Sequence, residues 1–296
     1  MKNIISRRKT IQILASAIAM FPIPLRANKN IYHYHWNGIA LGNPVEMKIF
    51  AKNKNHLDKI FFLVNSEIKR IDNIFYLQNA SSKINQLNQN KVLFNPDREL
   101  INAIYLSEKF YKISKGSYDI TIQPLWNKYS SGKNIILDGI NFNNIDISKQ
   151  KIRLLNNYTE ITLNSLAQGI LTDRIHEILL NSGIENHLIN FGEGRASGIS
   201  PNKNKWNLNV NNNIIDITNK GYSVSEANST TLPNNMSHLF NANIKASAIN
   251  IPSKTTVIAK TATLADALST TYAVSNNLIR SELIKNFTEV QFIINN

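Results

Sequence analysis

A carboxylate and a hydroxyl stand four residues apart in the apolar segment TATLADALSTTYAV, residues 261–274. If this segment forms a helix after the strand-like TTVIAK, Asp266 and Thr270 project from one face of that helix. Such a pair can share a hard cation, because Mg²⁺ prefers oxygen ligands and often takes only one or two from the protein. The same spacing also fits a purely structural arrangement, in which Asp266 stabilises the helix N-terminus and Thr270 bonds to its own backbone.

A second segment, GSYDITIQPLWNKY at residues 116–129, combines an acid, three aromatic rings and a proline. We expect an irregular loop rich in rings that follows the glycine closing a helix. Such a loop can hold a planar ring system, with Tyr118 supplying a face and Asp119 a hydrogen-bond acceptor. A packed connection without a ligand is the alternative.

A third segment, LNSLAQGILTDRIHEIL at residues 163–179, reads as the start of a helix. Asn164 or Ser165 is expected to cap this helix, leaving backbone N–H groups where a phosphate can sit. Asp173 lies further along the same helix. An ordinary capped amphipathic helix explains these residues equally well.

Taken together and in this order, the three segments resemble the ApbE family of FAD:protein FMN transferases. That family moves FMN from FAD to a threonine of a target flavoprotein and releases AMP. The resemblance runs from about Ala40 to the carboxyl terminus. It rests on SYDITIQPL, which is similar to the family's Ala-Phe-Asp-Pro-Thr-Val-Gly-Pro-Leu, on the closer match LADALSTTYAV, and on NFGEGRASG, which resembles a glycine-rich strand end.

This resemblance implies a set of site residues, with Mg²⁺ as the cofactor and FAD as the substrate. Asp266 and Thr270 occupy the positions of the family's magnesium ligands, and the backbone carbonyl of Ala167 completes the metal site. His238 is a candidate general base for the attacking threonine, since a neutral imidazole titrates near working pH. The residues that the resemblance places against the flavin nucleotide are Leu41, Ser117, Tyr118, Asp119, Asn164, Gln168 and Asp173.

The chain also departs from the family pattern at several positions. LNSLAQG replaces Leu-Gly-Gly-Ile-Ala-Lys-Gly, so Gln168 stands where the family has a lysine and a cation beside the diphosphate is lost. HLFNANIK keeps His238 but loses the family's proline and threonine-glycine turn, and SEA at residues 225–227 replaces Thr-Ser-Gly. These departures leave two alternatives open: a non-catalytic flavin-binding carrier or scaffold of the same fold, and an FAD hydrolase.

Hydrophobic periodicity predicts the elements that must position these residues. YHYHWNGIALGNPVEMKIF alternates like two strands, with turns expected at Asn37-Gly38 and Gly42-Asn43. Apolar residues recur at three and four residue steps over 56–75, which predicts a helix with one buried stripe. A second helix is expected to start with Asn95 as its cap and to stop at Gly116.

Strand-like segments dominate the rest of the chain, with a helix inserted before the last of them. The expected strands are YTEITL, NHLINF, KWNLNV, NIIDIT, YSVS, TTVIAK and TEVQFIIN. Because helices cluster early and strands late, the order predicts an α+β fold with largely antiparallel sheets and packed helices, which the resemblance makes an ApbE-like fold.

Composition sets the class of protein. At 296 residues and 43% hydrophobic, the chain can bury a large core as one domain or two packed lobes. The net charge of +13 is compatible with an anionic ligand. No tract of lysine and arginine with interleaved aromatics is present, which argues against nucleic-acid binding. The chain has no cysteine, so disulfides, thiolate catalysis and thiolate metal sites are excluded.

Residues 1–27 have the layout of an export signal, with basic residues before an apolar stretch. Arg7 and Arg8 favour the twin-arginine route, and a general secretory signal is the alternative. The apolar stretch contains two prolines and is shorter than the roughly 20 residues that span a bilayer. Cleavage after Ala27 is expected to release a periplasmic ApbE-like domain, residues 28–296, without a transmembrane segment. Its acceptor is then expected to be an exported or membrane-bound flavoprotein.

Overall fold

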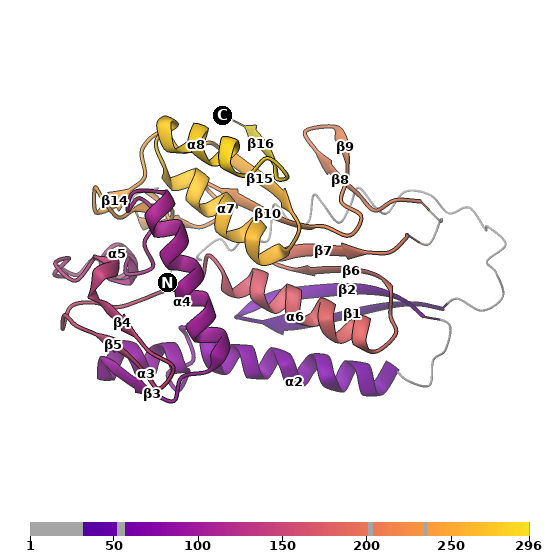
Figure 1. Ribbon diagram of the computed structural model, residues 1–296, viewed down its shortest axis with the longest axis horizontal. Helices are drawn as coiled ribbons and strands as arrows, with labels where there is room; N and C mark the ends of the chain where they lie inside the picture. Colours follow the sequence, from indigo (N-terminus) through magenta and orange to yellow (C-terminus); the bar gives the residue numbers. More distant parts are fainter. Residues whose placement is uncertain (1–31, 52–56, 201–203, 234–235, 296) are drawn as a thin grey trace.

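The computed structural model describes residues 32–51, 57–200, 204–233 and 236–295 (Figure 1). The expected export signal, residues 1–27, therefore lies outside the described residues. Within the described ranges, no helix has the length and apolar character needed to cross a membrane.

An antiparallel sheet with helices packed against it forms the body of the molecule. In the described part of the chain, the largest sheet has seven strands in the order β1-β2-β6-β7-β10-β15-β16, and every neighbouring pair is antiparallel. The strands are β1 (Tyr32–Ala40), β2 (Asn43–Ala51), β6 (Asn186–Phe191), β7 (Glu193–Ser197), β10 (Gly221–Glu226), β15 (Lys254–Ala259) and β16 (Gln291–Asn295). The predicted α+β class with antiparallel sheet is confirmed.

The helices gather beside this sheet, as Figure 1 shows. They are α2 (Leu57–Phe75), α3 (Lys83–Asn90), α4 (Arg98–Ile113), α5 (Gln123–Ser131), α6 (Ala167–Asn181), α7 (Ala262–Val274) and α8 (Asn277–Asn286). Helix α6 packs against β6 and β7, α7 packs against β10 and β15, and the two helices contact each other. Apolar side chains from α2, α6, α7 and the sheet share one continuous buried core.

Smaller sheets accompany the seven-stranded sheet. They comprise the sheet β3 (Val92–Phe94), β5 (Lys151–Leu154) and β4 (Ile145–Ile147), and the pairs β8 (Asn207–Val210) with β9 (Asn213–Asp216), β11 (Thr231–Leu232) with β12 (Met236–Ser237), and β13 (Phe240–Asn241) with β14 (Ala246–Ser247). A short 3₁₀ helix, η1 (Phe142–Asn144), precedes β4.

The first hairpin has a single turn, so the prediction of two turns was half wrong. Asn37 and Gly38 lie inside β1, with Gly38 paired to Val45. The chain reverses at Leu41 and Gly42, whose φ angles are +49° and +75°. Two consecutive positive φ angles match the twist of the flanking strands, and continuous pairing through Asn37 retains ladder hydrogen bonds that a turn there would lose.

Three other expectations about elements were wrong. Helix α4 starts at Arg98 after Asp97, because Asn95 donates its N–H to Gln150 O at 2.8 Å and belongs to the preceding turn. YTEITL forms only an isolated bridge between Glu160 and Ile122. The second half of the expected ring-rich loop is helix α5, whose first turn contains Pro124. Proline suits this position because an N–H group in the first turn has no partner within the helix.

Candidate functional site

A cavity of about 410 Å³ lies between the large sheet, α6, α7 and the segment before α5. Its volume falls in the range of small-molecule sites. Most of the residues predicted for the site line it: Leu41, Tyr118, Asp119, Asn164, Ala167, Gln168, His238, Asp266 and Thr270. The structure thus brings together the three segments that the sequence singled out. Ser117 and Asp173 are not in this lining.

Asp266 reaches the cavity from the middle of α7 and is buried. Its Oδ2 accepts a hydrogen bond from the backbone N–H of Gly169 at 3.3 Å, which places the carboxylate against the first turn of α6. A side chain at Gly169 would bring its Cβ to 2.7 Å from Thr263 Cα. The absence of a side chain there allows α6 and α7 to approach closely, and this approach brings Asp266 to the backbone N–H of Gly169.

Thr270 lies four residues after Asp266 on the same helix and also lines the cavity. Its Oγ1 is 3.4 Å from Ser225 Oγ on β10. The structural alternative for Asp266 does not describe this helix, because its first turn contains no acid and the side chain of Thr261 accepts from Leu264 N instead. The Asp266 carboxylate and the Thr270 hydroxyl are hard oxygen donors, and Ala167, whose carbonyl the family resemblance assigns to the metal site, lines the same cavity.

This donor set suits a cation that takes few protein ligands. Over the described residues, no group of three or more histidine, cysteine, aspartate or glutamate side chains is arranged to hold a metal ion. Asp266 supplies the carboxylate of the proposed donor set. Mg²⁺ commonly binds through one or two carboxylates and completes its shell with phosphate oxygens and water. The chemistry of these donors therefore fits Mg²⁺ together with a phosphate-bearing ligand.

Tyr118 and Asp119 line the cavity from the segment before α5. The Tyr118 hydroxyl lies 2.9 Å from Ser165 Oγ, and burial raises the pKa of Tyr118 to about 12. Asp119 accepts hydrogen bonds from the N–H and hydroxyl of Thr121, at 2.8 and 2.7 Å, and from Phe142 N at 2.9 Å. Burial raises the pKa of Asp119 to about 6, although these hydrogen bonds favour the ionised form.

The expected cap of α6 was wrong. The N-cap position is Leu166, and no side chain accepts a hydrogen bond there. Ser165 does not cap because its hydroxyl contacts Tyr118, and Asn164 precedes the helix with its N–H directed to Thr162 Oγ1 at 3.4 Å. In place of a side-chain cap, the Asp266 carboxylate accepts from the third residue of the helix, Gly169.

Gln168 is buried at the start of α6 and faces the turn between β6 and β7. Gly192 in that turn has a φ of +90°, and a Cβ added to it would lie 2.4 Å from Gln168 Nε2. The positive φ is the feature that favours glycine at this position. The amide of Gln168 therefore occupies the space beside Gly192 where a side chain would project.

The rim formed by the β1–β2 turn is anchored by α2. Leu41 donates its backbone N–H to Asp72 Oδ1 at 2.7 Å, which stabilises a φ that non-glycine residues rarely adopt. A Cβ on Gly42 would lie 2.5 Å from the hydroxyl of Tyr76. Asp72 on α2 and Tyr76, which directly follows that helix, thus fix the position of Leu41 at the cavity.

His238 is buried and also lines the cavity. Its Nδ1 is 3.1 Å from the carbonyl oxygen of Thr230. A carbonyl only accepts hydrogen bonds, so Nδ1 carries the proton in the neutral ring and Nε2 is the basic nitrogen. The ring of Trp126 on α5 lies beside it, with centroids 6.0 Å apart.

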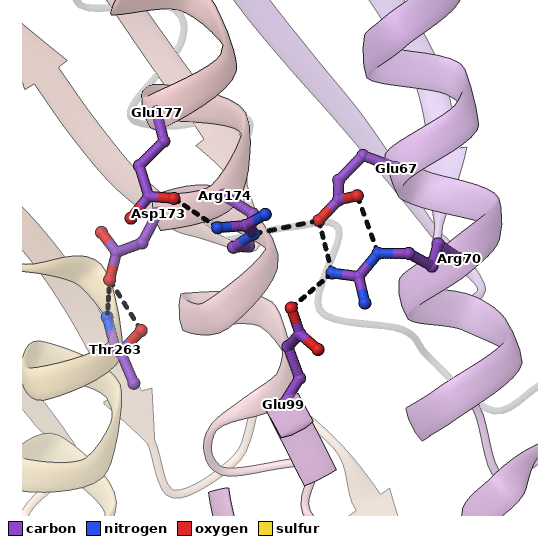
Figure 2. A network of polar contacts seen from close by, with 7 residues as sticks. All are labelled: Glu67, Arg70, Glu99, Asp173, Arg174, Glu177 and Thr263. Carbon is purple, nitrogen blue, oxygen red and sulfur yellow. Dashed lines mark hydrogen bonds and ion pairs between the residues drawn. The ribbon is translucent and has the colours of Figure 1, made fainter. Parts of the chain in front are cut away.

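Asp173 and Ser117 have contacts that their predicted role did not suggest. Asp173 accepts hydrogen bonds from the first turn of α7, including the N–H and hydroxyl of Thr263 (Figure 2). It also forms an ion pair with Arg195 at 2.7 Å. It lines a separate cavity of about 610 Å³ beside α4 and α6. Ser117 is buried, and its Oγ lies 3.4 Å from Asn243 Nδ2.

A network of charged side chains ties α2 to α6 next to Asp173, as Figure 2 shows. Glu67 on α2 accepts from Arg70 at 2.7 and 2.9 Å and from Arg174 at 3.1 Å. Arg70 also donates to Glu99 at 2.8 Å. These ion pairs are partly exposed, so their contribution to stability is modest.

The contact between Ser225 and Thr270 was not predicted from the sequence. Ser225 lines the cavity and lies within 2.8 Å of Ser269 on α7. A signal for it was present, because the alternation in YSVS places Ser223 and Ser225 on one face of a strand. What the alternation could not give is which helix covers that face.

Comparison with known proteins agrees with this geometry. A model of the ApbE family matches residues 41–294. No curated protein matches the chain. Among solved structures, the flavin transferase ApbE from Vibrio cholerae superposes with a TM-score of 0.78 at 14% identity, covering 89% of this chain and 93% of that one.

Two further solved structures are similar. The apo form of the flavinyl transferase ApbE from Pseudomonas stutzeri has a TM-score of 0.78 and 17% identity, covering 90% of this chain and 93% of that one. The ApbE protein from Thermotoga maritima has a TM-score of 0.75 and 21% identity, covering 89% and 94%. At these identities the superpositions establish the fold, whereas the family match spans most of the sequence. The chain belongs to the ApbE family.

Proposed function

We propose that this protein transfers FMN from FAD to a threonine of a target flavoprotein and releases AMP. The observation that carries the proposal is one cavity that joins Tyr118 and Asp119, the start of α6, and the pair Asp266 and Thr270. Membership of the ApbE family supports flavin transfer in general. The ring-bearing segment suits an isoalloxazine, and the oxygen donors suit the diphosphate with its cation.

Asp266, Thr270 and the carbonyl of Ala167 are the residues that would hold Mg²⁺. When bound, Mg²⁺ neutralises charge on the diphosphate and stabilises the departing phosphate of AMP, an effect worth several kcal/mol. The buried position of Asp266 strengthens its attraction for a cation, because little water screens it.

His238 is the candidate for accepting the proton of the acceptor threonine. Its Nδ1–H is held by the Thr230 carbonyl, so Nε2 has the lone pair that a general base needs. As the proton moves to Nε2, the threonine oxygen forms a bond to the FMN phosphorus. The bond from that phosphorus to the bridging oxygen breaks, and AMP leaves with that oxygen.

We place the protein outside the cytoplasmic membrane, with an exported or membrane-bound flavoprotein as the acceptor. The support is the sequence of residues 1–27, in which Arg7 and Arg8 precede an apolar stretch. Amino-terminal sequencing of protein recovered from the periplasmic fraction tests this placement. A start at or near residue 28 supports export, and an intact amino terminus found only in the cytoplasm contradicts it.

An in-gel assay tests the transfer itself. The purified full-length chain is mixed with FAD, Mg²⁺ and an acceptor peptide that contains a threonine, and covalent flavin fluorescence is read after denaturing electrophoresis. We expect a fluorescent acceptor band that EDTA and Asp266→Ala abolish. Asp146→Ala is the matched control, because Asp146 is exposed on β4.

The same assay separates the alternatives. Bound flavin without a labelled acceptor would identify a carrier or scaffold. Release of free FMN and AMP without labelling would identify an FAD hydrolase, in which water replaces the threonine hydroxyl.

A further inference from the structure

Four hydroxyl groups form a connected chain between β10 and α7, beside the oxygen donors of the cavity. Ser223 Oγ and Ser225 Oγ each lie 2.8 Å from Ser269 Oγ. Ser225 Oγ lies 3.4 Å from Thr270 Oγ1. At the other end, Ser269 Oγ donates to the backbone carbonyl of Asp266 at 3.1 Å. Ser225 and Thr270 line the cavity.

The direction of every hydrogen bond in this chain follows from the number of hydrogens. A hydroxyl has one hydrogen and can accept twice, whereas a carbonyl only accepts. Ser269 therefore donates its one hydrogen to the Asp266 carbonyl and accepts from both Ser223 and Ser225. Since the hydrogen of Ser225 is directed to Ser269, the contact between Ser225 and Thr270 requires Thr270 to donate.

This ordering directs the Thr270 hydroxyl toward Ser225, over a contact of 3.4 Å. Its hydrogen is directed to Ser225 on the strand, so the lone pairs of Oγ1 are left for the cavity that Asp266 also lines. A cation needs these lone pairs and is repelled by a hydroxyl hydrogen. If Thr270 had no acceptor beside it, its hydrogen would be free to turn toward the cation side.

The chain is held rigidly at its buried end. Ser269 is fully buried and Ser223 is almost so. Ser223 and Ser225 are two residues apart on β10 and project toward α7, which packs against that strand. Ser223 is a side branch, because it donates to Ser269 but contributes nothing to the link from Ser269 through Ser225 to Thr270.

We infer that Ser225 and Ser269 are positioning residues that direct the lone pairs of Thr270 toward a bound divalent cation. This inference rests on the proposed function, since it assumes that Asp266 and Thr270 hold the cation. Partners that orient metal ligands from behind typically contribute about ten- to a hundredfold to metal affinity. The contact from Ser225 to Thr270 is the longest of the four, so we expect an effect near the lower figure.

Titration of the purified full-length chain with Mn²⁺ alone, followed by the electron paramagnetic resonance signal of free Mn²⁺, tests the inference without measuring transfer. We expect Ser225→Ala and Ser269→Ala to raise the Kd for Mn²⁺ about tenfold. Ser225→Thr keeps a hydroxyl and should restore the affinity of the unaltered protein. Ser223→Ala removes a buried hydroxyl from the same cluster but leaves the link intact, so its Kd should not change. Thermal unfolding followed by circular dichroism checks that each variant folds.

The outcomes separate this inference from the proposed metal site. If Mn²⁺ binding is lost in Asp266→Asn but unchanged in Ser225→Ala, the positioning role is overturned and the metal site stands. If Ser223→Ala weakens binding as much as Ser225→Ala, the effect is general packing and the positioning role is again overturned. If the unaltered protein binds no Mn²⁺, or binds it equally with Asp266→Asn, the metal site fails and the inference fails with it.

Discussion

The Asp173 carboxylate accepts two hydrogen bonds from Thr263, one from its N–H at 2.9 Å and one from its hydroxyl at 2.6 Å. It also accepts from Ala262 N at 3.0 Å and pairs with Arg195. An anion at this position satisfies the unpaired N–H groups of the first turn of α7 and complements the helix dipole. Asp173 therefore fixes the N-terminus of the helix that carries Asp266 and Thr270.

Replacing Asp173 should weaken the fold. Asp173→Ala removes the acceptor of the Ala262 and Thr263 N–H groups in the first turn of α7 and leaves the largely buried Arg195 without its carboxylate, so we expect the free energy of unfolding to fall by about 2 kcal/mol. Urea denaturation measures the change. Asp173→Asn keeps one acceptor oxygen and should lose less. If stability were unchanged while the Kd for FAD rose, Asp173 would instead act on the flavin, as the family resemblance implies.

His238→Asn should slow transfer while FAD binding persists. Loss of a general base typically lowers the rate by about 10² to 10⁴. The turnover number is measured from acceptor labelling at saturating FAD, and the Kd for FAD is measured by flavin fluorescence. His35→Asn is the control, since His35 is exposed on β1 beside Glu46. Full turnover in His238→Asn would remove His238 from the mechanism.

Asp119 should make stability depend on pH. The pKa of Asp119 is raised by burial to about 6, from 3.8 in an unfolded chain. Between these values the folded state binds a proton that the unfolded state does not, so this group lowers the free energy of unfolding as pH rises from about 4 to about 6. The decrease is up to about 3 kcal/mol.

Asp119→Asn removes this titration. The variant also loses a hydrogen-bond acceptor, which lowers the free energy of unfolding by an amount that does not vary with pH. Its amide cannot accept both from Thr121 and from Phe142 N. We therefore expect the stability difference between the unaltered protein and the variant to shrink as pH rises through this window. Urea denaturation at several pH values measures it, and parallel stability curves would contradict the raised pKa.

Gln168→Lys should tighten FAD binding. The substitution restores a cation at the start of α6, next to the cavity expected to hold the diphosphate. We expect the Kd for FAD to fall about tenfold at low salt, which corresponds to about 1.4 kcal/mol, and the gain to shrink as salt screens the charge. Gln168→Met has similar length without the charge. An equal gain in Gln168→Met would show that shape, rather than charge, limits binding.

Much of the fold and part of the site could be predicted from local pattern. Helix α2 and the late strands follow periodicity, and the four-residue spacing of Asp266 and Thr270 places them on one face of α7. The role of Asp173 could not be predicted, because its partner Thr263 is far along the chain and only the packing of α6 on α7 brings them together. The predicted cap of α6 was wrong for a similar reason, since Ser165 bonds to a tyrosine from another segment.

Short segments without strong periodicity were the other source of error. Helix α3 has the cap Ser82, which accepts from Asn85 N at 3.4 Å, but its polar composition gives a weak apolar stripe. Helix α5 has a proline in its first turn, Pro124, that also suits a loop. In both segments local preference was ambiguous, and contacts with the rest of the chain decided the conformation.

The β1–β2 turn at Leu41 and the donor pair on α7 face one cavity although they come from opposite ends of the described chain. A ribosome makes the turn early and α7 near the end of synthesis, so the cavity has no complete wall while the polypeptide is still growing. Contacts between residues so far apart in the sequence also form slowly during folding. A nascent chain, which lacks one wall of the cavity, should therefore be unable to capture a flavin nucleotide. Loading must wait until the finished polypeptide has folded.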